Sequence, residues 1–144
     1  MEYFDIKGND TASGEIVPSG NKNEALPVIA ASLLVNGKVV IHNVPDILDV
    51  RNMLKIVTDL GAVVRTISKN TLEIDSSDLS SKALDKDLCG LVRTSVLFAG
   101  PLLARHGSVI LPPPGGDVIG RRRLDTHFLG FEQLGAVYNR DDNI

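Results

Sequence analysis

Hydrophobic residues recur along the chain with helical and strand-like spacing in turn. Residues 24–34 form a dense apolar run that predicts a buried helix. This helix begins near Lys22, because Pro27 is tolerated only in the first turn of a helix. Residues 38–42 then predict a buried strand. The next apolar stripe has helical spacing and stops at Gly61, and it consists of Val50, Met53, Leu54, Val57 and Leu60.

The pattern after this helix predicts a β-hairpin and then a second round of helix, strand and helix. Residues 62–68 and 71–74 form the arms of the hairpin, which turns at positions 69 and 70. Residues 93–105 predict a second buried helix, and residues 108–111 predict a strand. A last helix ends before Gly135 and directs three side chains inward, namely Leu124, Phe128 and Phe131. Ahead of the first helix, residues 3–8 and 14–18 predict two short strands.

The two rounds are copies of one unit. Residues 33–41 resemble residues 102–110, and the sequence Leu-Gly-Ala-Val stands at both 60–63 and 134–137. Equivalent points lie about 70 residues apart, and two copies indicate a duplication rather than a solenoid array. We therefore expect a mixed fold of the α+β class, in which repeated helices pack on a small sheet.

Composition narrows the class of protein. The 144 residues are 43% hydrophobic, which suffices for one compact domain and excludes a disordered chain. A net charge of −3 and the absence of tryptophan argue against binding of nucleic acid or of an anionic membrane. Neither a membrane helix nor a secretory signal is evident. The single cysteine, Cys89, cannot form an internal disulfide, so we expect a cytoplasmic protein.

Cationic and small polar residues gather where the two buried helices begin. Residues 19–23 read Ser-Gly-Asn-Lys-Asn. A helix start favours anions, and with Lys22 this segment predicts a phosphate or carboxylate site. The alternative is a glycine turn with an asparagine cap and a solvated lysine. Arg93 opens the equivalent helix of the second copy, followed by Thr94 and Ser95, and the alternative there is a surface arginine.

The loop at residues 112–123, Pro-Pro-Pro-Gly-Gly-Asp-Val-Ile-Gly-Arg-Arg-Arg, is the most informative stretch. Glycines let the backbone approach a ligand closely, and arginine forks suit phosphate or carboxylate. A lone acid beside such a cluster, Asp117, can exchange a proton with a bound anion. The glycine spacing fits neither a P-loop nor a dinucleotide fingerprint. The alternative is a solvated charged loop.

The remaining candidate residues give weaker indications of a reactive or binding site. His42, His106 and His127 lack metal-ligand spacing, so we expect no metal, although His127 lies where a ligand contact is feasible. Cys89 is expected to pack rather than to act as a nucleophile. Asp125 is either an acid that complements the helix dipole or a hydrogen-bond acceptor for a sugar or an amide.

Three ordered motifs resemble the UDP-N-acetylglucosamine 1-carboxyvinyltransferases, the enolpyruvyl transferases of peptidoglycan synthesis. Residues 19–27 resemble the opening motif of that family, and residues 93–95 and 100–105 resemble its second helix. Residues 114–122 resemble its mobile active-site loop, and Asp125, His127 and the Leu-Gly-Ala at 134–136 follow. The resemblance extends from about residue 4 to residue 137. Two positions depart from the family pattern: Arg123 replaces a usual proline, and Leu97 replaces a common tryptophan.

The resemblance implies transfer of enolpyruvyl from phosphoenolpyruvate to the 3′-hydroxyl of UDP-N-acetylglucosamine, with release of phosphate and without metal or cofactor. Lys22, Arg93 and Arg122 match the positions that bind phosphoenolpyruvate, and Asn23 matches a contact near the reacting hydroxyl. Asp117 matches a position that usually holds a reactive cysteine and in some members an aspartate. Its implied role is general acid at the enolpyruvyl methylene or assistance in product release, which makes Asp117, Lys22 and Arg122 the implied catalytic residues. The implied contacts at the uridine end are Leu124, Asp125 and Thr126.

The family also implies an architecture. Its members are much longer and consist of two similar domains, each built from three repeats in an inverse α/β barrel, with the active site between them. On this basis residues 1–21 are strands of the second domain, residues 22–90 are the first αβ repeat, and residues 91–144 are an incomplete second repeat. The chain alone is expected to be inactive, and to self-associate or to bind a complementing chain.

The implied reaction is the first committed step of peptidoglycan synthesis, which links it to cell-wall biogenesis, cell shape, the cell cycle and division. Two other functions stay open at this point. One is a non-catalytic anion-binding or assembly module derived from the enzyme. The other is a related enolpyruvyl transferase that acts on shikimate 3-phosphate.

Overall fold

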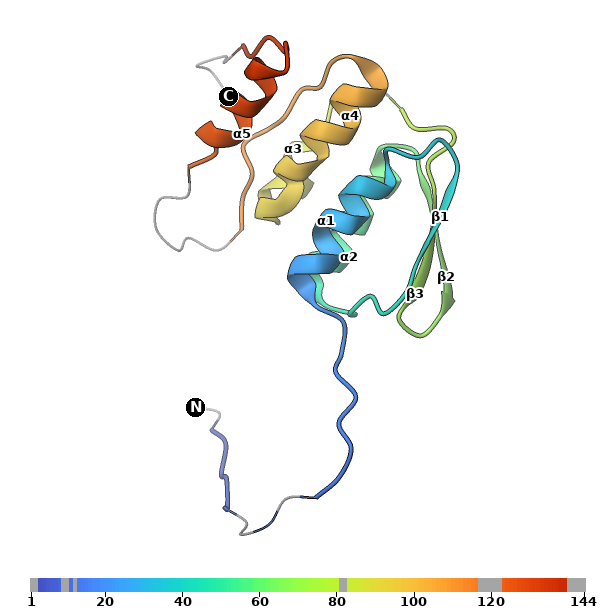
Figure 1. The fold of residues 1–144 in the computed structure, drawn as a ribbon, viewed down its shortest axis with the longest axis vertical. Coiled ribbons are helices and arrows are strands. Elements are labelled where there is room, and N and C mark those ends of the chain that lie inside the picture. The colour runs from blue at the N-terminus through green and yellow to red at the C-terminus, as the bar shows by residue number, and fades with distance from the viewer. Residues whose placement is uncertain (1–2, 9–10, 12, 81–82, 117–122, 140–144) are drawn as a thin grey trace.

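The computed structural model describes residues 3–8, 11, 13–80, 83–116 and 123–139. Figure 1 shows an extended N-terminal arm that leads into a body of helices beside a small sheet. The elements in chain order are α1 (Lys22–Ser32), β1 (Lys38–Ile41), α2 (Leu48–Asp59), β2 (Val63–Ser68), β3 (Thr71–Asp75), α3 (Lys86–Gly90), the 3₁₀ helix η1 (Arg93–Phe98), α4 (Ala99–His106) and α5 (Asp125–Gln133).

The sheet is antiparallel, and β3 lies between β1 and β2. On one side Lys38 pairs with Asp75, and on the other side Val63 pairs with the same residue. The β2–β3 hairpin turns at positions 69 and 70, where Asn70 adopts a left-handed backbone with φ of 63°. Asparagine tolerates this conformation well, which explains why the predicted turn forms there.

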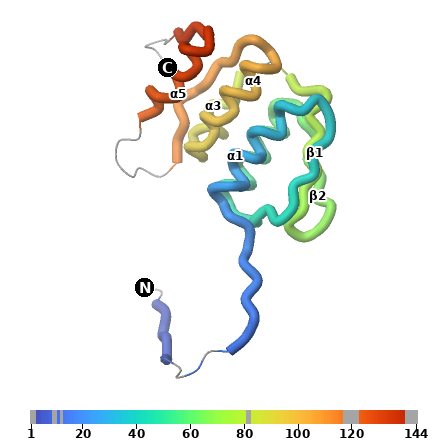
Figure 2. The backbone as a smooth tube through the Cα atoms, viewed as in Figure 1, coloured from blue at the N-terminus to red at the C-terminus, as the bar shows by residue number. Residues whose placement is uncertain are grey.

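One hydrophobic core joins the helices and the sheet, with the helices on one side and the strands on the other (Figures 1 and 2). Helix α1 packs against α2, and α2 packs against β2. The 3₁₀ helix η1 packs on both α1 and α2. The largest fully buried side chains include Leu26 and Ile29 of α1 and Leu33 at its C-terminal end, Met53 and Ile56 of α2 and Leu60 at its C-terminal end, Ile74 of β3, Phe98 of η1 and Leu102 of α4.

The structure confirms the mixed α+β class, the first two helices, the first strand and the hairpin. The helix predicted at 93–105 forms in two parts, since a 3₁₀ turn changes to α-helix between Phe98 and Ala99. Pro101 thereby falls in the first turn of α4, where its missing N–H costs no helical hydrogen bond. The short helix α3 was not predicted.

Three predicted strands do not form in the described part of the chain. Residues 108–111 are irregular, and the N–H of Leu84 donates a long backbone hydrogen bond of 3.5 Å to the carbonyl of Ile110. Residues 3–8 and 14–18 also form no strand, and their apolar side chains, such as Phe4 and Ile16, are exposed. A strand needs a neighbour for its backbone hydrogen bonds, and these segments have no strand beside them among the described residues.

The last helix forms as predicted, although it is packed loosely. Phe128 and Phe131 are the half-buried side chains of α5, and Leu124 just before it is also half-buried. None of the described residues of α5 is fully buried. Phe128 stacks on Tyr138 beyond the helix, with ring centroids 4.4 Å apart.

Candidate functional site

Three helices begin toward the same end of the helical layer. Figure 1 shows α1, the η1–α4 run and α5 starting on one side, with the loop before Gly116 returning to that side. Helix α1 packs directly on η1. The first residues of these helices are Lys22, Arg93 and Asp125, three of the predicted site residues. The fold therefore brings η1, which begins at Arg93, against α1, which begins at Lys22.

The start of α1 is held by close backbone contacts. Asn21 caps the helix, because its Oδ1 accepts a hydrogen bond from the N–H of Asn23 at 2.8 Å. Gly20 passes so close to Asn43 that a Cβ on it would lie 1.8 Å from that residue's carbonyl oxygen. Only glycine fits at this point. The capping alternative is therefore correct for Asn21, and it leaves Lys22 as the first helical residue.

Lys22 forms an ion pair with Asp49. The lysine Nζ contacts Oδ2 of Asp49, and the two side chains are 50% and 31% exposed. Asp49 is the second residue of α2 and lies in its first turn. Sequence reasoning missed this residue, although an acid in the first turn of the second helix was a visible signal. The lysine is thus oriented by a neighbour and still reachable from solvent.

The root of the 112–123 loop packs against the start of η1. Gly115 and Gly116 donate backbone hydrogen bonds to the carbonyls of Cys89 and Gly90, at 2.9 and 3.2 Å. A Cβ on Gly116 would lie 3.1 Å from the backbone nitrogen of Arg93. The half-buried Arg93 is therefore the neighbour of the loop root. The predicted Asp117 and Arg122 lie outside the described residues.

The start of α5 carries the predicted uridine contacts. Leu124 is half-buried, while Asp125 and Thr126 are exposed. Asp125 forms an ion pair with Arg123, whose Nε contacts its Oδ2. Arg123, which departs from the family pattern, therefore orients an acid of this stretch. His127 is also exposed, and its backbone N–H donates a hydrogen bond of 2.9 Å to the carbonyl of Leu124.

Cys89 and the candidate metal ligands add no reactive group to the site among the described residues. Cys89 is only 1% exposed, and burial raises the pKa of its thiol, so the unreactive protonated form is favoured. This confirms its packing role. Within the described ranges, no three His, Cys, Asp or Glu side chains gather as a metal site. In the same ranges no helix is long and apolar enough to cross a membrane.

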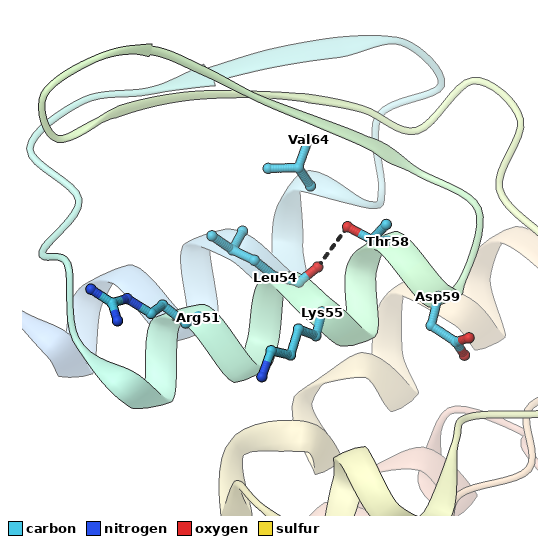
Figure 3. A pocket seen from close by; sticks show the side chains of 6 residues that line it. All are labelled: Arg51, Leu54, Lys55, Thr58, Asp59 and Val64. Carbon is cyan, nitrogen blue, oxygen red and sulfur yellow. Dashed lines mark hydrogen bonds between the residues drawn. The ribbon is translucent and has the colours of Figure 1, made fainter.

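An open hollow of about 530 Å³ lies between α2 and β2, away from the candidate residues. Figure 3 shows its lining, in which the hydroxyl of Thr58 bonds to the carbonyl of Leu54 at 2.9 Å. Arg51 at its edge is engaged in a double hydrogen bond with Asp46. Neither Lys22 nor Arg93 is among the lining residues. We do not assign the candidate site to this hollow.

Comparisons with known proteins agree with the resemblance. The family model described as EPSP synthase (3-phosphoshikimate 1-carboxyvinyltransferase) matches residues 6–143. A UDP-N-acetylglucosamine 1-carboxyvinyltransferase of Bradyrhizobium diazoefficiens is 50% identical over 144 residues, which are 100% of this chain and 33% of that protein. The protein of the same name from Treponema denticola is 47% identical over 143 residues, which are 99% of this chain and 34% of that protein.

The solved structures add a likeness in fold. The enolpyruvyl transferase NikO from Streptomyces tendae superposes with a TM-score of 0.59 and 28% identity, covering 66% of this chain and 22% of that one. The chain thus spans about a third of the length of the curated relatives it matches. The similarity confirms the predicted correspondence to an N-terminal portion.

Proposed function

The chain belongs to the EPSP synthase family, and on this premise we propose that it is part of an enolpyruvyl transferase acting on phosphoenolpyruvate and UDP-N-acetylglucosamine. The observation that carries the proposal is the 50% identity, over the whole chain, to a UDP-N-acetylglucosamine 1-carboxyvinyltransferase. The chain supplies one wall of the active site. The remaining two-thirds of the enzyme supplies the facing wall.

The proposed reaction needs positive charge where phosphate departs. The 3′-oxygen of the acceptor sugar forms a bond to C2 of the enolpyruvyl group, the bond from C2 to the phosphate oxygen breaks, and the hydroxyl proton leaves with phosphate in the overall balance. Lys22, Arg93 and Arg122 are proposed to bind phosphoenolpyruvate and to stabilise the charge on the departing phosphate. Cations held in place before the reaction lower its barrier, because they need no reorganisation. The oriented Lys22 and the half-buried Arg93 support this assignment.

The acceptor is proposed to lie along the starts of α1 and α5. Asn23, exposed beside Lys22, would contact the sugar near the reacting hydroxyl. The stretch at 124–126, two residues of which are exposed, would contact the uridine end. Asp117 is proposed as the general acid at the enolpyruvyl methylene or as an aid to product release. No cofactor or metal takes part in this scheme.

The cellular role and the domain organisation are proposed on the same premise. We place the enzyme in the cytoplasm at the first committed step of peptidoglycan synthesis, and hence in cell-wall formation, cell shape, the cell cycle and division. Residues 1–21 are proposed to add strands to the second domain, residues 22–90 form the first repeat and residues 91–144 begin the second. The exposed apolar side chains of Phe4 and Ile16 support this division, since they need a partner surface. Such a surface would come from a complementing chain or from a second copy of this one.

Shikimate 3-phosphate is the second candidate acceptor, because the matching family model is described by that activity. The test joins residues 1–144 to the remaining two-thirds of the Bradyrhizobium relative and measures phosphate release from phosphoenolpyruvate with each acceptor. We expect release with UDP-N-acetylglucosamine only. Release with shikimate 3-phosphate alone would assign the second candidate, and release with neither would leave a non-catalytic binding module.

A further inference from the structure

We propose that Asp49 is a positioning residue for Lys22, an inference that rests on the proposed function because it assigns Lys22 to the anionic substrate. Its carboxylate holds the lysine ammonium at the start of α1 and directs the remaining N–H groups toward the ligand. The ion pair between the two side chains is the contact that carries the inference.

The chemistry of the ammonium group fits this role. A lysine ammonium has three N–H donors on a flexible stem, so an unpaired lysine spreads over many rotamers. The bond to Asp49 occupies one donor and leaves two for a phosphate or carboxylate oxygen. Lys22 is 50% exposed, so a ligand can reach these donors while the ion pair is kept.

The backbone around the pair is fixed as well. Asn21 caps α1, and Gly20 lies against Asn43 with no room for a side chain. That contact ties the start of α1 to the segment that leads into α2, whose second residue is Asp49. The distance between the two charged residues is therefore set by packed backbone rather than by their side chains alone.

A nearby carboxylate offers a matched control. Asp46 precedes α2 and is exposed, and it makes a double hydrogen bond to Arg51 rather than to Lys22. Replacing Asp46 or Asp49 by asparagine removes one charge from the same segment. Only the replacement of Asp49 should change the orientation of the Lys22 ammonium group.

The kinetic test uses the joined enzyme described above. Asp49→Asn should lower kcat about 10- to 100-fold, because a group displaced by about 1 Å loses most of its contribution to the transition state. KM for phosphoenolpyruvate should stay constant or fall, since loss of a negative charge makes the site more attractive to an anion. Asp49→Glu should recover kcat to within about threefold of the unchanged enzyme, and Asp46→Asn should leave both constants unchanged.

A spectroscopic readout separates positioning from folding. In the 144-residue chain, the 1H–15N signal of the Lys22 ammonium should shift in Asp49→Asn and stay in place in Asp46→Asn, with equal melting temperatures for the two variants. An unchanged Lys22 signal, or a kcat for Asp49→Asn within twofold of the unchanged enzyme, overturns the inference. If the unchanged joined enzyme releases no phosphate, the proposed function fails. In that case the positioning claim is tested by adding phosphoenolpyruvate to the 144-residue chain. The Lys22 signal should shift more in the unchanged chain than in Asp49→Asn.

Discussion

The backbone N–H of Gly115 donates a hydrogen bond of 2.9 Å to the carbonyl oxygen of Cys89. This bond fastens the root of the 112–123 loop to α3, directly before the helix that Arg93 opens. The described part of the loop is therefore fixed beside Arg93, a proposed substrate-binding residue.

Gly115→Ala should destabilise the chain by about 1–3 kcal/mol, because a new side chain here overpacks a closed contact. Its Cβ would lie 1.6 Å from the carbonyl oxygen of Gly90, which is backbone and cannot rotate away. Urea unfolding measures the loss. Gly130→Ala is the matched control, since a Cβ there meets nothing within 4 Å and alanine favours the helix. Equal stability of the two variants would contradict the described loop root.

Arg105→Lys should destabilise the chain by about 2–3 kcal/mol, since hydrogen bonds to a charged group are stronger than neutral ones. Its Nη1 lies 3.2 Å from the carbonyl of Leu33 and 2.9 Å from that of Ser76, so it joins α4 to the ends of α1 and β3. Lysine keeps the positive charge but lacks the planar guanidinium group with its several N–H donors. Arg51→Lys, a change in an exposed ion pair, should alter the urea midpoint little. A similarly small effect of Arg105→Lys would show that these hydrogen bonds do not stabilise the packing of α4 against the ends of α1 and β3.

Cys89 should resist alkylation in the folded chain and react once the chain is unfolded. Burial raises the pKa of its thiol, so the folded state favours the protonated form. The resulting stabilisation is present below the thiol's ordinary pKa of about 8.5 and is lost as pH rises through the higher folded value. Iodoacetamide labelling with and without urea checks the first point. A melting temperature that falls above about pH 8.5 more steeply than in Cys89→Ala checks the second.

Asp117 should make the joined enzyme resistant to fosfomycin. The family resemblance implies that this epoxide alkylates the cysteine that usually occupies the matching position. A carboxylate is a much poorer nucleophile toward an epoxide. Mass spectrometry should detect the adduct on Asp117→Cys and none at residue 117 of the unchanged protein. An adduct on Asp117 itself would refute the prediction.

Local patterns in the sequence were sufficient to predict the helices and strands of residues 22–75. The apolar stripe from Val50 to Leu60 predicted α2, and the polar pair before Thr71 predicted the hairpin turn, because helix period and turn chemistry are local properties. The strands predicted at 3–8, 14–18 and 108–111 depended on partners outside each segment. Local spacing cannot supply those partners, and the described residues do not provide them.

The positions of two candidate site residues were predictable for the same reason. The structure confirms that Lys22 and Arg93 lie at helix starts, and their roles in binding stay predictions. The acid at the start of α2 is visible in the sequence, but its ion pair with Lys22 depends on the packing of α1 against α2, which no local pattern specifies. Likewise the contact of Gly115 with Cys89 joins segments that only the folded chain brings together.

The central claim is that the end of the molecule where α1 and η1 begin binds phosphoenolpyruvate. The most direct measurement is kcat/KM for phosphoenolpyruvate in the joined enzyme carrying Lys22→Gln, beside Lys55→Gln on the exposed face of α2. Loss of one preorganised charge should lower the value for Lys22→Gln about 100-fold or more, while Lys55→Gln stays within twofold. Equal values for Lys22→Gln and the unchanged enzyme would contradict the account.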